Sequence, residues 1–260
     1  MTHRTRLFAL LFAAPFIGTA SAQASDWEQQ IDTSVSMIEA TDIEFANGVL
    51  NIDPITTRAG YPRFVGEWTR DERAAPLMLQ RLINGDDHPT VQAALVEALP
   101  RTGGEWDDAI AALWEDTTEP TVRRMMVLTL EKASDDVAYH ALTTAAASED
   151  AEVRAAAVRA MTWRKDADRY EPVFLATLTD QNDEVRSLSA RASGLHKLAD
   201  AKLGLASMLD SETRDDIRLN VLIALHQIDA EYARSLSAVT RIAREEDGKL
   251  GRTAVRLLAD

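Results

Sequence analysis

Short apolar segments recur along this chain at a nearly constant interval. Each begins with an apolar residue that follows a polar loop, and these leading residues stand 31 to 33 positions apart: Val91, Val122, Val153, Val185, Ile217 and Leu250. Further apolar or small residues stand four, seven and eight positions after the leading residue, which is the pattern of one helix face. Six copies at one interval indicate an internal structural repeat.

A second helical pattern precedes most of these segments. It is seen at residues 107–116, 136–147, 171–180 and 232–243. Pro172 suits the first turn of its helix, where the missing N–H costs nothing, and Asp107 and Asp136 suit helix N-caps. Only 6% of the residues are aromatic and alanine is frequent, which favours close helix packing over a β-sandwich. The expected fold class is all-α.

The paired helical patterns resemble a known repeat family. Helix pairs of about 31 residues, with an acidic loop followed by Val-Arg and then alanines, resemble HEAT repeats of the short bacterial type, which also occur in phycobilisome-lyase-like proteins. The resemblance covers roughly residues 72–260. It implies an α-solenoid with a right-handed superhelix of about six helix pairs. It does not imply one function, because the family includes scaffolds, lyase subunits, hydroxylases and DNA-binding enzymes.

The resemblance also implies a role for the arginines that follow the leading residues. In such stacks this arginine and an acid about six residues earlier commonly form a polar ladder between neighbouring repeats. The four central copies carry it, at Arg123, Arg154, Arg186 and Arg218. Gln92 and Gly251 replace it in the outer copies, as expected of terminal repeats. Acids stand at the expected offset in Asp86, Asp180 and Glu212, whereas Thr117 and Ser148 interrupt the series. We interpret these arginines as structural.

The start of the chain resembles a secretory signal peptide. Arg4 and Arg6 precede an apolar stretch, and Ala20 and Ala22 supply the small residues of a cleavage site. The expected organisation is a signal peptide at 1–22, an N-terminal helix and capping segment at 23–71, and the repeat array at 72–260. Cleavage after Ala22 predicts a soluble periplasmic or secreted protein.

The segment between the signal and the repeats does not follow the interval. Apolar residues at helical spacing predict an opening amphipathic helix, at Trp27, Ile31, Val35 and Ile38. Residues 42–53 then fit two structures equally. Asn47-Gly48 suits a two-residue hairpin turn, and Gly48 equally suits the end of a helix that runs to Asn47. Either structure would cover the exposed flank of the first repeat.

Charge and composition disfavour several functions. Without residues 1–22 the chain has 26 basic and 42 acidic residues, a balance of −16, which disfavours nucleic-acid and anionic-membrane binding. Cysteine is absent, which excludes disulfides and thiolate chemistry. The histidines that remain are isolated, and no calcium-loop, phosphate-loop or nucleophile motif occurs. No metal or cofactor is expected.

One face of the repeat helices stands out from this acidic background. Positions three, six and ten after each leading residue point away from the core pattern and would line the concave surface of a stack. They include Ala94, Glu97, Arg101, Met125, Leu128, Lys132, Ala156, Arg159, Trp163, Leu188, Arg191, Leu195, Asn220, Ile223, Gln227 and Arg256. Five are basic and one is acidic. A helix phase shifted by one position would instead pack several of them between repeats.

Two functions from different classes follow. The first is a non-catalytic scaffold or adaptor of the cell envelope whose concave face binds a protein or an acidic peptide. Aromatic and arginine side chains often dominate such interfaces, so the candidate binding residues are Met125, Leu128, Lys132, Arg159, Trp163, Arg191 and Leu195. The second is a lyase-type or other enzyme subunit that positions a small anionic ligand on the same face. Repeat arrays expose extended surfaces rather than one deep pocket, which favours the first.

Overall fold

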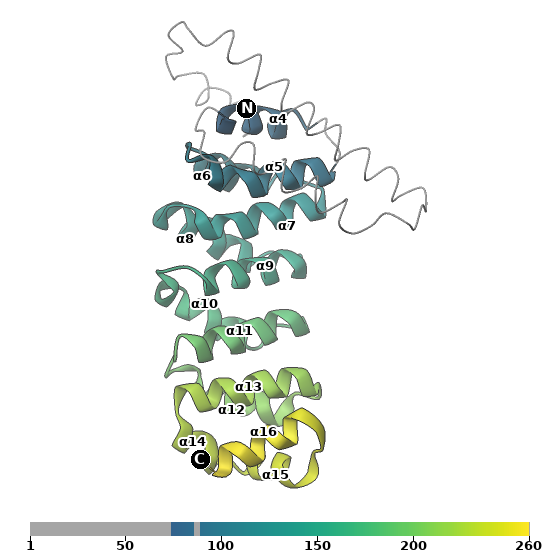
Figure 1. The fold of residues 1–260 in the computed structure, drawn as a ribbon, viewed down its shortest axis with the longest axis vertical. Helices are drawn as coiled ribbons and strands as arrows, with labels where there is room; N and C mark the ends of the chain where they lie inside the picture. The colour runs from purple at the N-terminus through teal and green to yellow at the C-terminus, as the bar shows by residue number, and fades with distance from the viewer. Residues whose placement is uncertain (1–73, 86–88, 260) are drawn as a thin grey trace, which may run out of the picture. The chain divides into compact units, whose positions relative to one another are not determined.

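The part of the chain that the structure describes is built from helices (Figure 1). The structure is a computed structural model, and it describes residues 74–85 and 89–259. These ranges contain thirteen α-helices, two 3-10 helices and no strand, which confirms the all-α fold class. The predicted signal peptide, the capping segment at 23–71 and its alternative structures at 42–53 lie outside the described residues.

The helices are mostly short and follow one another closely. Their bounds are α4 Ala74–Asn84, α5 Pro89–Thr102, α6 Asp107–Leu113, α7 Pro120–Thr129, η1 Leu130–Lys132, α8 Asp135–Ala146, α9 Ala151–Thr162, η2 Ala167–Tyr170, α10 Glu171–Thr177, α11 Asp183–Leu195, α12 Ala201–Ser211, α13 Asp215–Ile228, α14 Ala230–Ser235, α15 Ser237–Glu245 and α16 Gly248–Ala259.

The chain divides into two compact units, and the division falls inside α8. The first unit ends at Ala138 and the second begins at Tyr139. In the first unit, α5 packs against both α4 and α7, and α6 packs against α7. The right-handed superhelix expected for the whole array stays a prediction.

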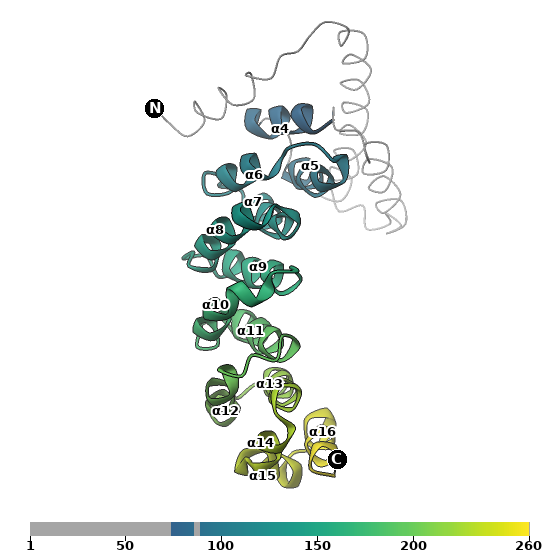
Figure 2. The same ribbon diagram turned by 90° about the vertical axis from the view of Figure 1, so that its left-hand side faces the viewer.

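The second unit contains two layers of helices. Helices α9, α11 and α13 lie side by side in one layer, and α10 and α12 lie in the other layer, against α11 and α13 (Figure 2). Helix α16 packs on both α13 and α15. Because α9, α11 and α13 come from successive repeats, residues at equivalent positions of the repeat fall next to one another across this layer.

The residues that define the repeat form the core. All six leading residues are buried, with Leu250 the most exposed of them at 3%. Ala157, Ala160 and Met161 of α9 are buried as well, at the predicted core positions. Burying such side chains stabilises the fold by about 25 cal/mol for each Å² of apolar surface removed from water.

A polar residue three positions before the leading residue caps α7, α9 and α11 and fixes where these helices begin. The Asp150 side chain accepts a hydrogen bond from the Glu152 amide, and the Asn182 side chain accepts from the Glu184 and Val185 amides. These caps satisfy amides that would otherwise lack a partner at the helix start. The polar loop and the leading apolar residue therefore together set the start of α9 and α11.

Three local predictions were wrong. Asp107 is the first residue of α6 rather than its cap, and its carboxylate accepts from the Asp108 and Ser134 amides. It therefore ties the loop before α8 to the start of α6. Asp136 lies inside the first turn of α8. The helix predicted at 232–243 is interrupted at Leu236, whose extended backbone separates α14 from α15.

Gly251 has a steric reason to replace the repeat arginine. A Cβ atom at this position would lie 1.8 Å from the carbonyl oxygen of Glu246, because the chain turns back tightly at the start of α16. Glycine is the residue that permits so close an approach of two backbone segments. The tight turn into α16 thus excludes every side chain from this position.

Candidate functional site

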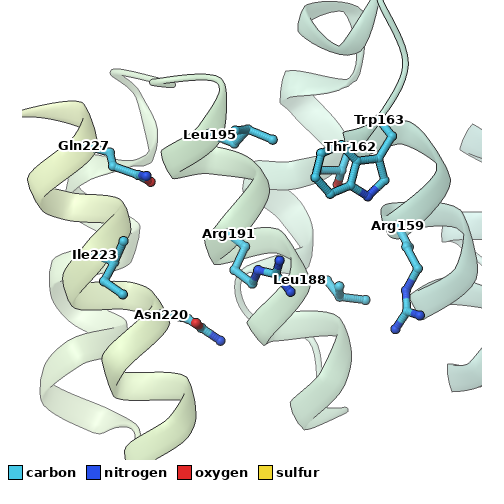
Figure 3. Close-up of a pocket in the computed structure, with 9 residues that line it drawn as sticks. All are labelled: Arg159, Thr162, Trp163, Leu188, Arg191, Leu195, Asn220, Ile223 and Gln227. Carbon is cyan, nitrogen blue, oxygen red and sulfur yellow. The ribbon is translucent and has the colours of Figure 1, made fainter. Parts of the chain in front are cut away.

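Three helices of the second unit together line a pocket of about 480 Å³ (Figure 3). Helices α9, α11 and α13 contribute its residues, with Trp163 at the end of α9. The lining residues are Arg159, Thr162, Trp163, Leu188, Arg191, Leu195, Asn220, Ile223 and Gln227. A volume of this size falls within the range of ligand-binding sites.

The repeat interval orders the lining residues into rows across the three helices. Trp163, Leu195 and Gln227 form one row, each 32 positions after the previous residue. Arg159, Arg191 and Ile223 form a second row at the same spacing, and Leu188 and Asn220 belong to a third. The first two rows take one residue from each of the three helices, whereas the third row takes residues from α11 and α13 only.

The pocket exposes an unusual amount of apolar surface. Trp163 is 59% exposed, Leu195 48% and Ile223 37%. Single exposed apolar residues are ordinary, but three that line one concavity are typical of an interaction site. The other tryptophans that the structure describes, Trp106 and Trp114, are buried. Trp163 is therefore placed to contact a ligand.

The two arginines of the pocket differ in their partners. The Arg159 guanidinium donates to the Glu184 carboxylate, with a distance of 2.7 Å from Nη2 to Oε1. Arg191 is exposed and has no hydrogen-bond or ion-pair partner among the residues described. Asn220 donates to the Ser187 hydroxyl. Arg191 therefore supplies the unpaired positive charge of the pocket.

The predicted basic character of the face is weaker than the sequence indicated. Arg101 pairs with Glu97 one helical turn away, and Lys132 pairs with its neighbour Glu131. With Arg159 held by Glu184, three of the five predicted basic residues have acidic partners. Glu97 belongs to the same face, whereas Glu131 and Glu184 lie outside it, and a count of charges on that face does not include these two acids.

The predicted binding residues do not all meet in this pocket. Arg159, Trp163, Arg191 and Leu195 line it, whereas Met125, Leu128 and Lys132 belong to α7 and η1 of the first unit. Met125 and Leu128 are half-buried and Lys132 is exposed. The pocket therefore contains four of the seven candidate residues.

Two further assignments to the face were wrong, and one pocket residue was missed. Ala94 and Ala156 stand at the third position of the pattern but are buried, so they belong to the helix packing. Thr162 stands at the ninth position, which the pattern omits, and it lines the pocket next to Trp163. Its hydroxyl donates to the carbonyl of Val158, as threonines at helix ends often do.

A hydrogen bond joins the ends of α9 and α11 at the residue that precedes Trp163. The His196 ring, which caps α11, lies 3.0 Å through Nε2 from the Thr162 carbonyl oxygen. The same ring stacks on Phe174 with an angle of 2° between the planes. Because a carbonyl only accepts hydrogen bonds, Nε2 is the protonated donor. This contact links the helix ends that carry Trp163 and Leu195.

Helices α11 and α13 approach each other closely at a glycine. A Cβ atom on Gly194 would lie 2.6 Å from the Cα of Ala224 and 2.5 Å from Oε1 of Gln227. Glycine thus permits the close packing of the two helices and leaves room for the Gln227 amide over α11. Gly194 shapes this side of the pocket without lining it.

Three of the four predicted ladder arginines join neighbouring repeats. Arg154 binds Asp180 through two parallel hydrogen bonds of 2.8 Å, and Arg186 binds Glu212 at 3.1 and 2.7 Å. Arg218 binds Glu246 at 2.8 Å. Each acid lies in the loop that precedes the next repeat helix. Glu246 was not predicted, because it stands one position away from the regular offset.

Arg154 and Arg186 also bind their own loops. Arg154 donates to the carbonyls of Ser148 and Glu149, and Arg186 donates to those of Asp180 and Gln181. One planar guanidinium thus satisfies acceptors on two successive loops, which a lysine could not do in the same geometry. We refer to Arg154, Arg186 and Arg218 with their acids as the arginine clamps.

Arg123 lies in a different environment from the other three. Its guanidinium carbon lies 5.3 Å from the centre of the Trp114 ring, a cation–π arrangement, and its Nε is buried without a hydrogen-bond partner. No carboxylate pairs with Arg123 in the ranges that the structure covers. The sequence indicates this difference, because Ser148 stands at the position where the other repeats place the acid that pairs with the arginine.

The arginine clamps predict an acid-labile second unit. Burial raises the pKa of Asp180, but hydrogen bonds from Arg154 and from the Asn182 amide outweigh burial and hold that pKa below its ordinary value. Burial likewise raises the pKa of Glu212, while hydrogen bonds from Arg186 and two loop amides lower it by more. A carboxyl whose folded pKa is depressed stabilises the fold above its unfolded pKa, about 4, and that stability is lost as pH falls further.

Urea unfolding measured between pH 7 and pH 2.5 tests this prediction. The free energy of unfolding should decrease below about pH 5. In the double variant Asp180→Asn plus Glu212→Gln, the free energy of unfolding should be lower at pH 7 and should decrease less between pH 7 and pH 2.5. Parallel curves for the two proteins would show that other carboxyls cause the acid lability.

Neither metal chemistry nor a membrane span receives support from the described residues. They contain no group of three or more His, Cys, Asp or Glu side chains that could hold a metal ion. None of their helices combines the length and the apolar character needed to cross a bilayer.

Comparisons with known proteins do not identify a relative. A scan against models of protein families gave no match, and a search of curated proteins gave none.

Proposed function

We propose that this protein is a non-catalytic interaction module of HEAT-repeat type, and that it binds a partner protein through the pocket of α9, α11 and α13. The observation that carries the proposal is the concavity in which Trp163, Leu195 and Ile223 are exposed around the unpaired Arg191. Tryptophan and arginine are enriched at the energetic centres of protein interfaces, because they bury a large area and donate hydrogen bonds.

The chemistry of the lining favours binding over catalysis. The nine lining residues include no carboxylate, histidine, cysteine, lysine or tyrosine, the side chains that usually act as nucleophiles or as general acids and bases. The Thr162 hydroxyl is engaged by a carbonyl. These features support a scaffold or adaptor over the alternative, an enzyme subunit that positions a small anionic ligand.

Site-specific photocrosslinking tests the proposed function. A photoreactive phenylalanine analogue placed at Trp163 should crosslink to a partner protein in extracts of the source cells. The matched control places the same analogue at Leu203 on α12, which is exposed but outside the pocket. A partner captured from position 163 and absent from position 203 supports the proposal. Equal capture at both positions contradicts it.

We further propose that the partner is met in the cell envelope, after export. Arg4, Arg6 and the apolar stretch that follows them support this location. The prediction is that the protein recovered from its source begins at Gln23, because cleavage follows Ala22. Intact-mass measurement on the purified protein checks it. A mature protein that retains residues 1–22 would contradict export by this route.

A further inference from the structure

The charges around the pocket restrict what the partner can present. Arg191 is unpaired, Arg159 is engaged by Glu184, and no acid lines the pocket itself. The chain as a whole carries a net charge of −14, so a polyanion would be repelled by most of the surface. A ligand with a single carboxylate gains the contact with Arg191 at the smallest electrostatic cost.

The apolar residues indicate what stands next to that carboxylate. Leu195 lies one helical turn from Arg191 on α11, about 5–6 Å away between Cβ atoms. Trp163 precedes Leu195 in the same row. Two residues on one face of an extended peptide are separated by a similar distance, about 6–7 Å, when they stand two positions apart. An apolar side chain two positions from an acid therefore matches Leu195 and Arg191.

The width of the pocket is sufficient for an extended peptide. Neighbouring helices pack about 8–10 Å apart, so a row across α9, α11 and α13 spans about 16–20 Å. An extended chain advances about 3.3 Å for each residue, and about six residues cover that span. The pocket is thus long enough for a hexapeptide segment that crosses the three helices obliquely, so that its acid and its apolar side chain can follow the direction from Arg191 to Leu195 on α11.

Resting on the proposed function, we infer that the pocket binds an extended peptide segment in which one carboxylate stands two residues from a bulky apolar side chain. Arg191 binds the carboxylate, and Trp163 with Leu195 receives the apolar side chain. Glu184 limits the affinity, because it occupies the Arg159 guanidinium, which would otherwise add a second, weaker contact to the carboxylate that Arg191 binds. The pair of Arg159 and Glu184 is half-exposed on both sides and therefore weak enough for a ligand to displace.

The test uses defined peptides and the full chain. The probe is the peptide acetyl-Ser-Phe-Ala-Glu-Ala-Ser-amide, and the control peptide has glutamine in place of glutamate. Binding is followed in nitrogen-15 NMR spectra through the indole N–H of Trp163, which a Trp163→Phe variant assigns. The glutamate peptide should shift this signal and bind about tenfold more tightly than the glutamine peptide, since a hydrogen bond from Arg191 to a charged carboxylate is stronger than one to a neutral amide.

Two variants separate the roles of the charges. Arg191→Gln should abolish the difference between the two peptides. Arg256→Gln, which removes the same charge from an exposed position on α16 outside the pocket, should preserve it. Glu184→Gln should tighten binding of the glutamate peptide by about two- to fivefold, the gain expected when an exposed ion pair no longer competes. A gain in affinity cannot arise from a variant that fails to fold.

Several results would overturn the inference. These are equal affinities for the two peptides, an unchanged or weaker affinity after Glu184→Gln, or binding of 3-phenylpropionate as tight as that of the hexapeptide. The last result would indicate a small-molecule site. If neither peptide binds while photocrosslinking at position 163 still captures a partner, the inferred peptide chemistry fails and the proposed function stands.

Discussion

Replacing Arg186 by leucine is expected to lower the free energy of unfolding by roughly 2–4 kcal/mol. The change removes the partner of Glu212, whose side chain is only 5% exposed, and so leaves a carboxylate that is nearly buried without its counter-ion. It also removes the donor that satisfies the carbonyls of Asp180 and Gln181. The cost reflects these unpaired acceptors more than any intrinsic strength of the ion pair.

Chemical denaturation of three variants checks this prediction. Arg214→Leu is the matched control, since Arg214 also pairs with two acids but is half-exposed, and its loss should cost clearly less than the loss of Arg186. The double variant Arg186→Leu plus Glu212→Leu should recover more than about 1 kcal/mol relative to Arg186→Leu alone, because it removes the unpaired charge. A double variant no more stable than the single one would contradict this explanation.

The substitution Gly194→Ala is expected to cost roughly 1–3 kcal/mol despite the higher helix propensity of alanine. The added methyl group would lie 2.6 Å from the Ala224 backbone, which cannot move without shifting α13. It would also displace the Gln227 amide from its place over α11. We therefore expect a loss of stability together with a changed pocket, although Gly194 does not line it.

Gly204→Ala on α12 is the matched control for this substitution. Its new methyl group would meet only the end of the Leu178 side chain, at 3.2 Å, and that side chain can adjust. Its effect on stability should remain within about 1 kcal/mol in either direction. If both alanine variants unfold at the same urea concentration as the parent, the close approach of α11 and α13 does not constrain the fold.

The helices and their buried faces could be predicted because the repeat supplied several samples of one pattern. The leading residues and the core positions of α9 and α13 are buried as expected. The sequence of a single copy would not have shown which face of the helix is buried. Apolar residues recur at the same positions in several copies, and this agreement indicated the face that packs in the core. The break at Leu236 could not be predicted in this way, because it occurs in one copy and follows no shared pattern.

The pocket could be predicted only in part, for two physical reasons. The sequence pattern identified the rows that contain Trp163 and Arg191, because their positions depend on helix periodicity alone. It did not predict the pairing of Arg159 with Glu184, because that contact joins two helices and depends on side-chain reach. It also misplaced Ala156, since a small residue can be buried where the same position in the next helix, Leu188, lines the pocket.

The spacing of the arginine clamps along the sequence has a consequence for the evolution of this chain. Arg154 pairs with Asp180, and Arg186 pairs with Glu212. In both pairs the arginine and the acid are 26 residues apart in the sequence. A deletion of residues 181–212 would remove one whole period of 32 residues. It would keep the pair of Arg154 and Asp180 and bring Arg218 to the place of Arg186. Removal of this period thus keeps a clamp at the new junction and leaves the pair of Arg218 and Glu246 in place, so recombination can vary the number of helices that contribute to a binding surface without loss of these contacts.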